Sequence, residues 1–369
     1  MVCPTKVNSI VANPHHYGLI LAGGRGTRFW PRSRRRSAKQ VLNVVGSRSL
    51  IQNTVDRLRP VIPGERLWVL TNDYLRDEIV RQLPRVPARQ ILAEPAQRNT
   101  APAIGLGAHI LQSIDPEAVM GVFPSDHVIA KEGLYRRLVR SAFRAAAGGK
   151  IVVLGILPRW PETGYGYIEF PRGVEAGPKV IPIRQFREKP GAATARRYVA
   201  SGRFFWNAGM FFWRTSVLLD ALRRHRPQMA TVLAALPPFQ SRSFHAKLRE
   251  TFPLCENISI DYAVLESAKG VVGIAADDIG WNDVGSWNAV YELLPHDSSG
   301  NATRAAELLS ASSARNYVDA EGKLVVLLGV EDLIVVDTTD ALLVAARSHA
   351  QRVSELVKTL EAKKREDLL

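Results

Sequence analysis

Residues 17–28 read YGLILAGGRGTR, and this stretch decides the fold that the sequence predicts. Its apolar half, residues 17–22, predicts a short buried strand, and the glycines that follow predict a turn at the end of that strand. A glycine turn after a parallel strand lets backbone N–H groups approach phosphate oxygens, because no Cβ stands in the way. We therefore expect an anion-binding loop at the carboxyl edge of a sheet.

Two well-known phosphate loops do not fit this stretch. A dinucleotide-binding fingerprint starting at Gly24 would need a small residue where Phe29 stands. It would also need an acidic residue roughly 20 positions further on, where none exists. A Walker A loop would need a glycine, a lysine and a serine or threonine in succession, and these are missing. The loop thus belongs to another class of phosphate site.

Basic residues crowd the segment after the glycine turn. The chain has a formal net charge of +14, and residues 1–55 contain no Asp or Glu. The sign alone would allow a nucleic-acid or anionic-membrane partner, and a solvated basic face is the ordinary use of such a run. The adjoining glycine loop favours a small phosphate ligand, so we expect neither of those partners. The basic residues are Arg25, Arg28, Arg32, Arg34, Arg35, Arg36, Lys39 and Arg48.

Length and composition indicate an ordinary globular protein. The 369 residues, 46% of them hydrophobic, suffice for one large domain and a smaller one. The two cysteines, Cys3 and Cys255, give neither a disulfide framework nor metal-ligand spacing, which favours a reducing compartment. No apolar run reaches the ~18 residues of a membrane span, and Pro4 and Pro14 interrupt the first residues, so we expect no signal peptide. The predicted location is cytoplasmic.

The first half of the chain alternates apolar strands with amphipathic helices. Apolar runs at 67–70, 118–123 and 151–154 predict a Rossmann-like, mostly parallel sheet in an α/β domain covered on both faces. Ligands bind such sheets at the carboxyl ends of the strands, where the strand order reverses. The glycine loop and residues 125–127 both follow strands of this kind, so we expect them to meet.

The pattern changes after about residue 300. Short apolar runs at 325–328, 333–336 and 341–344 are separated by turn-like segments and predict a small all-β unit. We therefore divide the chain into a catalytic domain, 1–298, and a small C-terminal domain, 299–369.

A terminal helix is expected after this β unit. Ser348 and Gln351 have the spacing of a capping box, which predicts the start of the helix. Apolar residues then recur at helical spacing. They are Ala350, Val353, Val357 and Leu360.

The segment 21–34, continuing to Lys39 and Gln40, resembles the opening motif of the sugar-phosphate nucleotidyltransferases. Its FWPRSR continuation at 29–34 is similar to the mannose-1-phosphate guanylyltransferase branch of that family. Further similar motifs follow in order, so that the resemblance covers about residues 17–345. They are EPAQRNTAPA (94–103), FPSDH (123–127), TGYGYIE (163–169), FREKP (186–190), WNAGMF (206–211), SIDYAVLE (259–266) and WNDVGSW (281–287).

The resemblance implies transfer of GMP from GTP to mannose 1-phosphate with release of pyrophosphate. It also implies a left-handed β-helix-like C-terminal domain and a homodimer through that region. The phosphomannose isomerase domain of longer bifunctional relatives is not expected here. Two positions depart from the family pattern: Ala38 replaces a proline before Lys39, which removes a rigid φ constraint but leaves the charge, and Ala208 replaces a serine beside Asn207.

The candidate catalytic residues carry charge. A sugar phosphate is already ionised at neutral pH, so its oxygen needs no dedicated general base to attack a phosphorus atom, and the protein must supply alignment and charge neutralisation. Arg28 and Lys39 are predicted to neutralise the triphosphate. Asp126 and Asp283 are predicted to hold Mg²⁺, which is typically bound by one or two carboxylates plus phosphates and water. Taken alone, Asp126 would be an ordinary helix cap and Asp283 an ordinary turn residue.

The remaining site residues are expected from the resemblance. The nucleotide side comprises Leu21, Ala22, Gly23, Gly24, Gly26, Thr27, Glu94, Asn99, Thr100 and Ser125. The sugar-phosphate side comprises Gly166, Glu169, Lys189 and Asn207. We expect packing roles for Trp206, Trp281 and Trp287, since aromatic burial is the commoner use of such residues. His127, with no second histidine or cysteine at metal-ligand spacing, is expected to pack or to support Asp126.

Two alternatives remain open at this point. The same reaction type could use another nucleotide or another hexose phosphate, because a glycine loop does not read the base. The second alternative is a non-catalytic, nucleotide-binding regulatory subunit. The presence of all four charged candidate residues, Arg28, Lys39, Asp126 and Asp283, disfavours this alternative.

Overall fold

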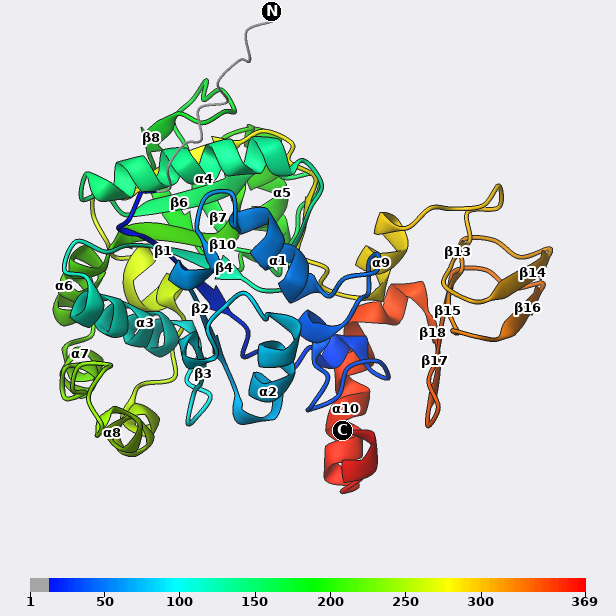
Figure 1. The fold of residues 1–369 in the computed structure, drawn as a ribbon. Coiled ribbons are helices and arrows are strands. Elements are labelled where there is room, and N and C mark those ends of the chain that lie inside the picture. Colours follow the sequence, from blue (N-terminus) through cyan, green and yellow to red (C-terminus); the bar gives the residue numbers. More distant parts are fainter. Residues whose placement is uncertain (1–12) are drawn as a thin grey trace, which may run out of the picture.

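The computed structural model describes residues 13–369. Residues 1–12, which include Cys3 and Pro4, lie outside it. A ten-stranded sheet forms the centre of the larger domain (Figure 1). The main path of this sheet runs β3 (Ile91–Ala93), β2 (Leu67–Thr71), β1 (His16–Leu21), β4 (Val119–Pro124), β10 (Phe204–Arg214), β6 (Val152–Ile156), β11 (Val272–Ala276) and β8 (Val180–Pro182). The short strands β7 (Tyr167–Glu169) and β9 (Gln185–Arg187) extend it beside β10.

The sheet is mixed but mostly parallel, as the sequence predicts. Strands β3, β2, β1 and β4 are parallel neighbours, and so are β6 and β11. Strand β10 lies between these two groups and is antiparallel to both β4 and β6, so the two groups point the same way. The strands β2 and β6 are buried along their whole length because helices cover both faces.

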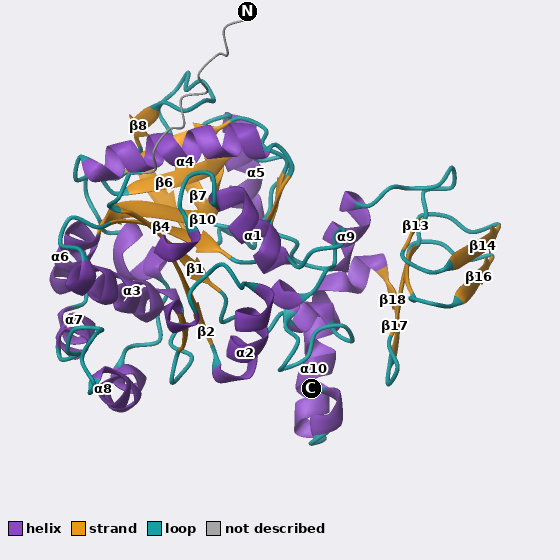
Figure 2. Ribbon diagram, in the orientation of Figure 1, coloured by secondary structure: helices purple, strands orange, loops and turns teal. Residues whose placement is uncertain are grey.

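Helices cover both faces of the sheet (Figure 2). On one face, α3 (Thr100–Ile114), α6 (Thr215–His225), α7 (Pro227–Ala234) and α8 (Phe244–Thr251) contribute to a single apolar cluster. On the other, α1 (Leu50–Leu58), α2 (Asp73–Gln82), α4 (Glu132–Ala147) and α5 (Ala192–Ser201) contribute to a second. The apolar positions of α4 recur at helical spacing, for example Tyr135, Leu138, Val139 and Phe143, which explains why one side of the helix is buried. Two short strands, β5 (Val128–Ile129) and β12 (Trp281–Asn282), pair beyond the end of β4.

The C-terminal domain is a small stack of parallel strands. Ala302 of β13 (Ala302–Thr303) pairs with Tyr317 of β15 (Tyr317–Asp319), which pairs in turn with Ile334 of β17 (Leu333–Asp337). A second stack joins β14 (Glu307–Ala311) to β16 (Leu324–Leu328), and β18 (Leu342–Ala346) closes the first stack in the antiparallel sense. Parallel pairing of successive turns of the chain confirms the small all-β domain. The handedness of its coil remains a prediction.

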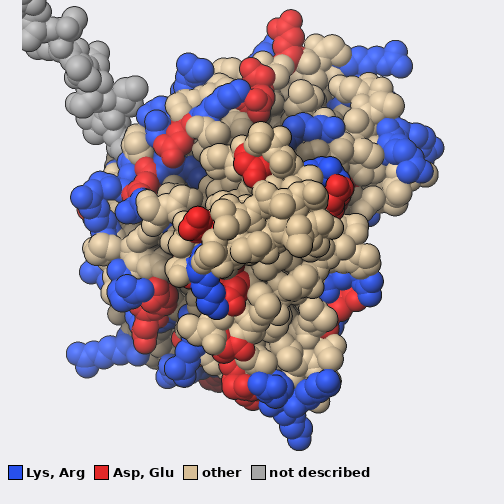
Figure 3. All heavy atoms as spheres, turned by 90° about the vertical axis from the view of Figure 1, so that its right-hand side faces the viewer, with Lys and Arg blue, Asp and Glu red and all other residues tan. Residues whose placement is uncertain are grey.

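One face of this domain is uncharged and exposed. Alternate residues of β16, Leu324, Val326 and Leu328, point to solvent together with Leu309 of the neighbouring strand. Figure 3 views this side of the molecule, where a broad uncharged area is surrounded by basic and acidic side chains.

Three helical segments join the domains. Helix α9 (Trp287–Leu293) ends the larger domain, and a 3₁₀ helix, Arg347–Arg352, leads from β18 into α10 (Val353–Ala362). The terminal amphipathic helix is thus confirmed, but the predicted capping box is wrong: the first turn is 3₁₀ and has no side-chain cap, and Gln351 bonds to Arg28 instead. The proposed domain boundary at 298 falls between α9 and β13 and remains a prediction.

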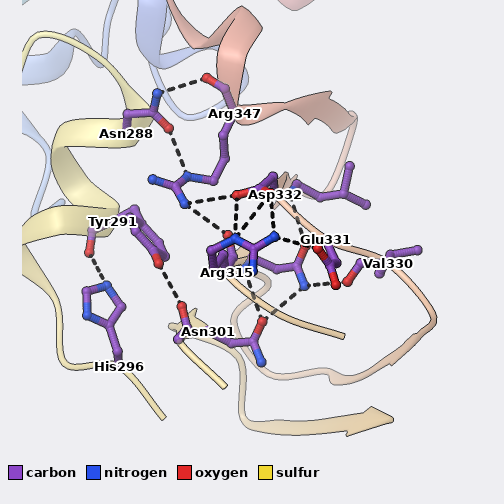
Figure 4. A network of polar contacts seen from close by, with 12 residues as sticks. Asn288, Tyr291, His296, Asn301, Arg315, Val330, Glu331, Asp332 and Arg347 are labelled. Carbon is purple, nitrogen blue, oxygen red and sulfur yellow. Dashed lines mark hydrogen bonds and ion pairs between the residues drawn. The ribbon is translucent and has the colours of Figure 1, made fainter. Parts of the chain in front are cut away.

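A polar network fastens α9 to the β domain (Figure 4). The Arg347 guanidinium donates to Asn288 Oδ1 of α9, and Asn288 Nδ2 donates to the Arg347 backbone carbonyl. The same guanidinium lies 3.7 Å from the centre of the Tyr291 ring. The same guanidinium is 3.5 Å from Asp332, which also pairs with Arg315. The network therefore ties the β strands to a helix that begins just after Asp283.

The basic segment identified in the sequence pairs largely with the C-terminal domain. Arg32 pairs with Asp319, Arg34 with Asp340 and Arg35 with Glu366. These three arginines are therefore not a free basic surface, because their charges are neutralised across the domain contact. Of the helices over residues 13–369, none is long and apolar enough to cross a membrane.

Candidate active site

The glycine loop follows β1, and the side chains of Gln40 and Thr71 hold it through hydrogen bonds to its carbonyl groups. The Ala22 carbonyl accepts hydrogen bonds from Gln40 Nε2 at 2.7 Å and from Thr71 Oγ1 at 3.0 Å, and Gln40 also donates to the Gly24 carbonyl at 2.9 Å. These bonds occupy the carbonyls and leave the loop fixed in shape. Ala22 itself is buried, so its role is to position the loop.

Gly26 has a backbone conformation that other residues rarely adopt. Its φ is 62°, and a Cβ there would lie 2.5 Å from Lys39 Cβ and 2.9 Å from Lys39 N. Lys39 therefore approaches the loop closely only because position 26 lacks a side chain. This pair fixes where the lysine enters the site.

A cavity of about 770 Å³ opens over this loop. Most of the residues expected on the nucleotide side line it. They are Leu21, Gly23, Gly24, Gly26, Thr27, Glu94, Asn99, Thr100 and Ser125. Asp126 also lies on its wall.

The ammonium group of Lys39 joins the two predicted metal-binding residues. Lys39 Nζ lies 2.7 Å from Asp126 Oδ2 and 2.6 Å from the Asp283 backbone oxygen, which are 87 and 244 positions away along the chain. Only 8% of the lysine side chain is exposed, so these contacts are largely shielded from water. The fold thus brings Lys39, Asp126 and Asp283 together.

Asp126 is held as a carboxylate. Burial alone would raise the pKa of this group, but the charge of Lys39 lowers it below its ordinary value. Its neighbour His127 has a pKa lowered to about 4 by burial and accepts a hydrogen bond from Trp281 Nε1 at Nδ1. A neutral, packed His127 confirms the supporting role expected from the sequence. Asp126 caps no helix, because β5 follows it directly.

Asp283 lies on a second cavity, of about 560 Å³. Its Oδ1 accepts a hydrogen bond from the Tyr165 hydroxyl at 2.6 Å. Burial and the nearby Asp283 carboxylate raise the pKa of Tyr165, so the hydroxyl stays a donor. A Cβ at Gly285 would lie 2.8 Å from Asp283 Oδ2, which explains the glycine in this motif. Arg28 lines this second cavity, not the larger one, and donates to Gln351 at 2.7 Å.

Glu94 is the most perturbed carboxyl group on the nucleotide side. Burial raises its pKa to about 8, and no cation of the described chain offsets this effect. At neutral pH the group can therefore either donate or accept a hydrogen bond. Asn99 and Thr100 shape the same wall: Asn99 has a φ of 66°, and Thr100 Oγ1 accepts from Ile260 N at 2.9 Å.

The sugar-side residue Asn207 lies beside an acidic cluster. Its Nδ2 donates to Asp261 Oδ1 at 3.0 Å, and its backbone N–H donates to the Gly166 carbonyl at 2.8 Å. Burial, together with the neighbouring Glu188, raises the pKa of Asp261 to about 7. Lys189 stands at the rim, where its ammonium group lies 3.2 Å from Glu188 Oε1.

Glu188, which was not among the residues predicted from the sequence, lies next to the predicted residues Gly166 and Lys189. Its Oε2 is buried and has no hydrogen-bond partner in the described chain, and a Cβ at Gly166 would lie 2.4 Å from that atom. Glu188 Oε2 therefore approaches the backbone so closely only because Gly166 has no Cβ, and it remains a buried carboxylate oxygen without a partner beside the predicted sugar residues. The sequence did carry a signal for Glu188, because it directly precedes the predicted residue Lys189 in the motif FREKP (186–190).

Glu169 lies apart from this group. Its carboxylate pairs with Arg203 at 3.1 Å and accepts from Gln185 at 2.8 Å. None of the four predicted sugar-side residues, Gly166, Glu169, Lys189 and Asn207, lines either of the two cavities. A sugar contact by Glu169 stays a prediction. The three tryptophans are buried, as expected.

Asp126 and Asp283 offer oxygen atoms of the kind that Mg²⁺ prefers. Within residues 13–369 no group of three or more His, Cys, Asp or Glu side chains is placed to hold a metal ion. Asp126 lies on the first cavity and Asp283 on the second, and Lys39 contacts both residues, so each would give an oxygen ligand to an ion that takes its other ligands from substrate phosphates and water. The residues therefore fit Mg²⁺ as a shared ion between protein and nucleotide.

Comparison with known proteins agrees with the mostly parallel sheet and the glycine loop described above. The family model described as nucleotidyl transferase matches residues 17–300, and one described as a MannoseP isomerase/GMP-like beta-helix domain matches residues 307–360. Together with the sheet and its loop, the first match defines a nucleotidyltransferase.

Individual relatives show which nucleotidyltransferases this chain is similar to. The mannose-1-phosphate guanylyltransferase of Escherichia coli (strain K12) is 39% identical over 94% of this chain and 73% of its own length. The mannose-1-phosphate guanylyltransferase ManC of Salmonella typhimurium (strain LT2) is also 39% identical, over 94% and 73%. A crystal structure described as mannose-1-phosphate geranyltransferase from Thermus thermophilus is 31% identical with a TM-score of 0.82, covering 94% of this chain and 99% of that one. The chain belongs to the mannose-1-phosphate guanylyltransferase family.

Proposed function

We propose that the protein transfers GMP from GTP to mannose 1-phosphate, giving GDP-mannose and pyrophosphate. The observation that carries this proposal is the Lys39 ammonium group, which joins Asp126 on the larger cavity to Asp283 on the smaller one. A reaction between two phosphorylated substrates needs two adjoining compartments and a cation where they meet. The family membership supports the choice of substrates.

The reaction balances without a covalent enzyme intermediate. A phosphate oxygen of mannose 1-phosphate forms a bond to the α-phosphorus of GTP, and the bond from that phosphorus to the oxygen bridging to the β-phosphate breaks. Pyrophosphate leaves with the electrons of that bond. The glycine loop, through Gly23, Gly24 and Gly26, presents backbone N–H groups to the triphosphate, and Lys39 neutralises charge at the transferring group. Arg28 acts from the second cavity, beside the incoming sugar phosphate.

Asp126 and Asp283 are the proposed ligands of Mg²⁺. When bound, the ion neutralises phosphate charge and orients the oxygens for in-line transfer. The lowered pKa of Asp126 supports this role, because a metal ligand must be ionised at neutral pH.

Substrate choice is assigned to polar side chains of the predicted site. Glu94, with Asn99 and Thr100, is the proposed guanine contact, because the Watson–Crick edge of guanine offers N–H donors to a carboxylate. Asn207 and Glu188 are the proposed contacts of the hexose hydroxyls. A wrong sugar would leave these half-buried groups unpaired, which discriminates more strongly than an apolar pocket can.

A pyrophosphate-release assay tests the proposal. We expect the highest kcat/KM for GTP with mannose 1-phosphate when GTP, ATP, UTP and dTTP are crossed with mannose and glucose 1-phosphates. A clear preference for UTP or dTTP would refute the assignment. ATP serves as the matched purine control, because it lacks the donors on which Glu94 is proposed to act.

Location and assembly are also proposals. The reaction would take place in the cytoplasm. A homodimer through the C-terminal domain is supported by the exposed apolar residues Leu324, Val326 and Leu328, since contiguous apolar surface marks interaction sites and one patch can pair with its own copy. Light scattering on the purified protein should then give twice the chain mass, and Val326→Asp should reduce it to one.

A further inference from the structure

Helix α10 comes from the C-terminal domain but forms part of the nucleotide cavity. Ser354, Val357, Lys358 and Glu361 line the 770 Å³ cavity together with the glycine loop. These positions recur at spacings of three and four, so one face of the helix is turned to the cavity. Figure 1 places α10 beside the blue N-terminal segment that carries the loop. The cavity therefore lacks a wall without this helix.

Three contacts hold α10 and the chain around it against the loop segment. Arg25 pairs with Glu361 at 2.6 Å, Arg28 donates to Gln351 at 2.7 Å, and Trp30 Nε1 donates to the Leu368 carbonyl at 3.0 Å. Each joins the segment just after β1 to the last part of the chain. A helix anchored in this way can present a side chain at a fixed place.

Lys358 is the cation that α10 presents. It lies three positions before Glu361 on the same face, and both residues line the cavity that the glycine loop also lines. Over residues 13–369 no carboxylate lies within ion-pair distance of Lys358, whereas Glu361 is neutralised by Arg25. The charge that α10 leaves unpaired on this wall is therefore positive, which suits a polyanion.

We infer that Lys358 binds the phosphates of the nucleotide, so that the C-terminal domain supplies part of the substrate site. This inference rests on the proposed function and adds a contact that the catalytic domain does not contain. Lys358 lines the first cavity and not the second, on which Asp283 lies. Its effect should fall on binding of GTP and not on mannose 1-phosphate.

The test compares Lys358→Met with Lys363→Met in the full chain. Lys363 lies on the same terminal segment, is exposed and lines neither cavity, so it controls for a change of net charge. Lys358→Met should raise the KM for GTP about threefold to tenfold, with kcat and the KM for mannose 1-phosphate nearly unchanged. The reason is that the contact between Lys358 and the nucleotide phosphates is expected to be equally strong in the ground state and in the transition state. Lys358→Arg should restore the wild-type KM, and added salt should shrink the difference.

Two further measurements separate the possible failures. Calorimetry of GTP binding without the sugar phosphate should give the same loss of affinity in Lys358→Met. If wild-type protein binds GTP but makes no GDP-mannose, the proposed function fails while this binding comparison still decides on Lys358. If Lys358→Met binds GTP as well as Lys363→Met does, the inference is overturned whatever the activity.

Discussion

Replacing Lys39 with Met is the sharpest test of the catalytic centre. Methionine keeps much of the aliphatic stem but removes the ammonium group that lies 2.7 Å from Asp126 and 2.6 Å from the Asp283 carbonyl. Because the lysine side chain is only 8% exposed, water cannot replace its charge beside the transferring phosphate. We expect kcat/KM in the pyrophosphate-release assay to fall about 100- to 1000-fold, or about 2.7–4 kcal/mol of transition-state stabilisation.

The same substitution should affect stability much less. Asp126 loses its cation, but its side chain is 32% exposed and can be hydrated, so the unfolding free energy should fall by about 1 kcal/mol. A thermal melt should show this as a Tm lower by about 2–4 °C.

Lys131→Met provides the matched control. Lys131 also lies 2.7 Å from a carboxylate, that of Asp278, but the two side chains are 56% and 66% exposed. Such a pair contributes at most about 1 kcal/mol, and turnover should not change. Turnover of Lys39→Met within threefold of wild type would refute the reasoning, because the lysine would then be only part of the basic surface.

Three more predictions address the metal site, the loop and the base contact. Asp126→Asn and Asp283→Asn should each stay folded, lose about 100-fold or more in activity and need more Mg²⁺ for the activity that remains. If the two residues share one ion, the double variant should lose much less activity than the product of the two single losses. Multiplicative losses would argue against a shared ion. Gly26→Ala should cost about 1–3 kcal/mol of unfolding free energy, because its Cβ would lie 2.5 Å from Lys39 Cβ at a φ of 62°, whereas Gly24→Ala, with nothing within 4 Å, should leave the Tm unchanged. Burial raises the pKa of Glu94 to about 8, so the carboxylate that accepts guanine donors increases as the pH rises through that value; the KM for GTP should therefore fall between about pH 7 and about pH 8.5. Glu94→Gln should remove that pH dependence, and an unchanged profile in this variant would exclude Glu94 as its source.

Local patterns were sufficient to predict the architecture. The apolar runs at 67–70 and 118–123 are strands because helices bury both of their faces, and a continuous apolar run is what such burial requires. The glycine loop was found for a similar reason, since its conformation needs residues without a Cβ. Alternation of strand and helix then placed Asp126 near that loop, and the structure brings both onto one cavity.

Contacts between distant segments could not be predicted in this way. The basic run after β1 adjoins the glycine loop in sequence, but Arg32, Arg34 and Arg35 pair with acidic residues more than 280 positions later in the chain. Nothing in local spacing says which carboxylate an arginine will meet. The capping box at Ser348 failed for the same reason, because Gln351 has a stronger partner in Arg28 than in the helix start. Glu188 was missed because its unpaired oxygen is a property of the packed site.

The ion pairs between the first and last parts of the chain also affect the order of folding during synthesis. Arg25 and Arg35 are translated early, but their partners Glu361 and Glu366 lie 336 and 331 positions later and leave the ribosome much later. Since domains generally fold as units while the chain is still being made, the catalytic sheet is complete before these acidic residues emerge. A nascent chain stalled before α10 would therefore leave Arg25 and Arg35 without their acidic partners beside an unfinished pocket, open to the RNA of the ribosome that carries it.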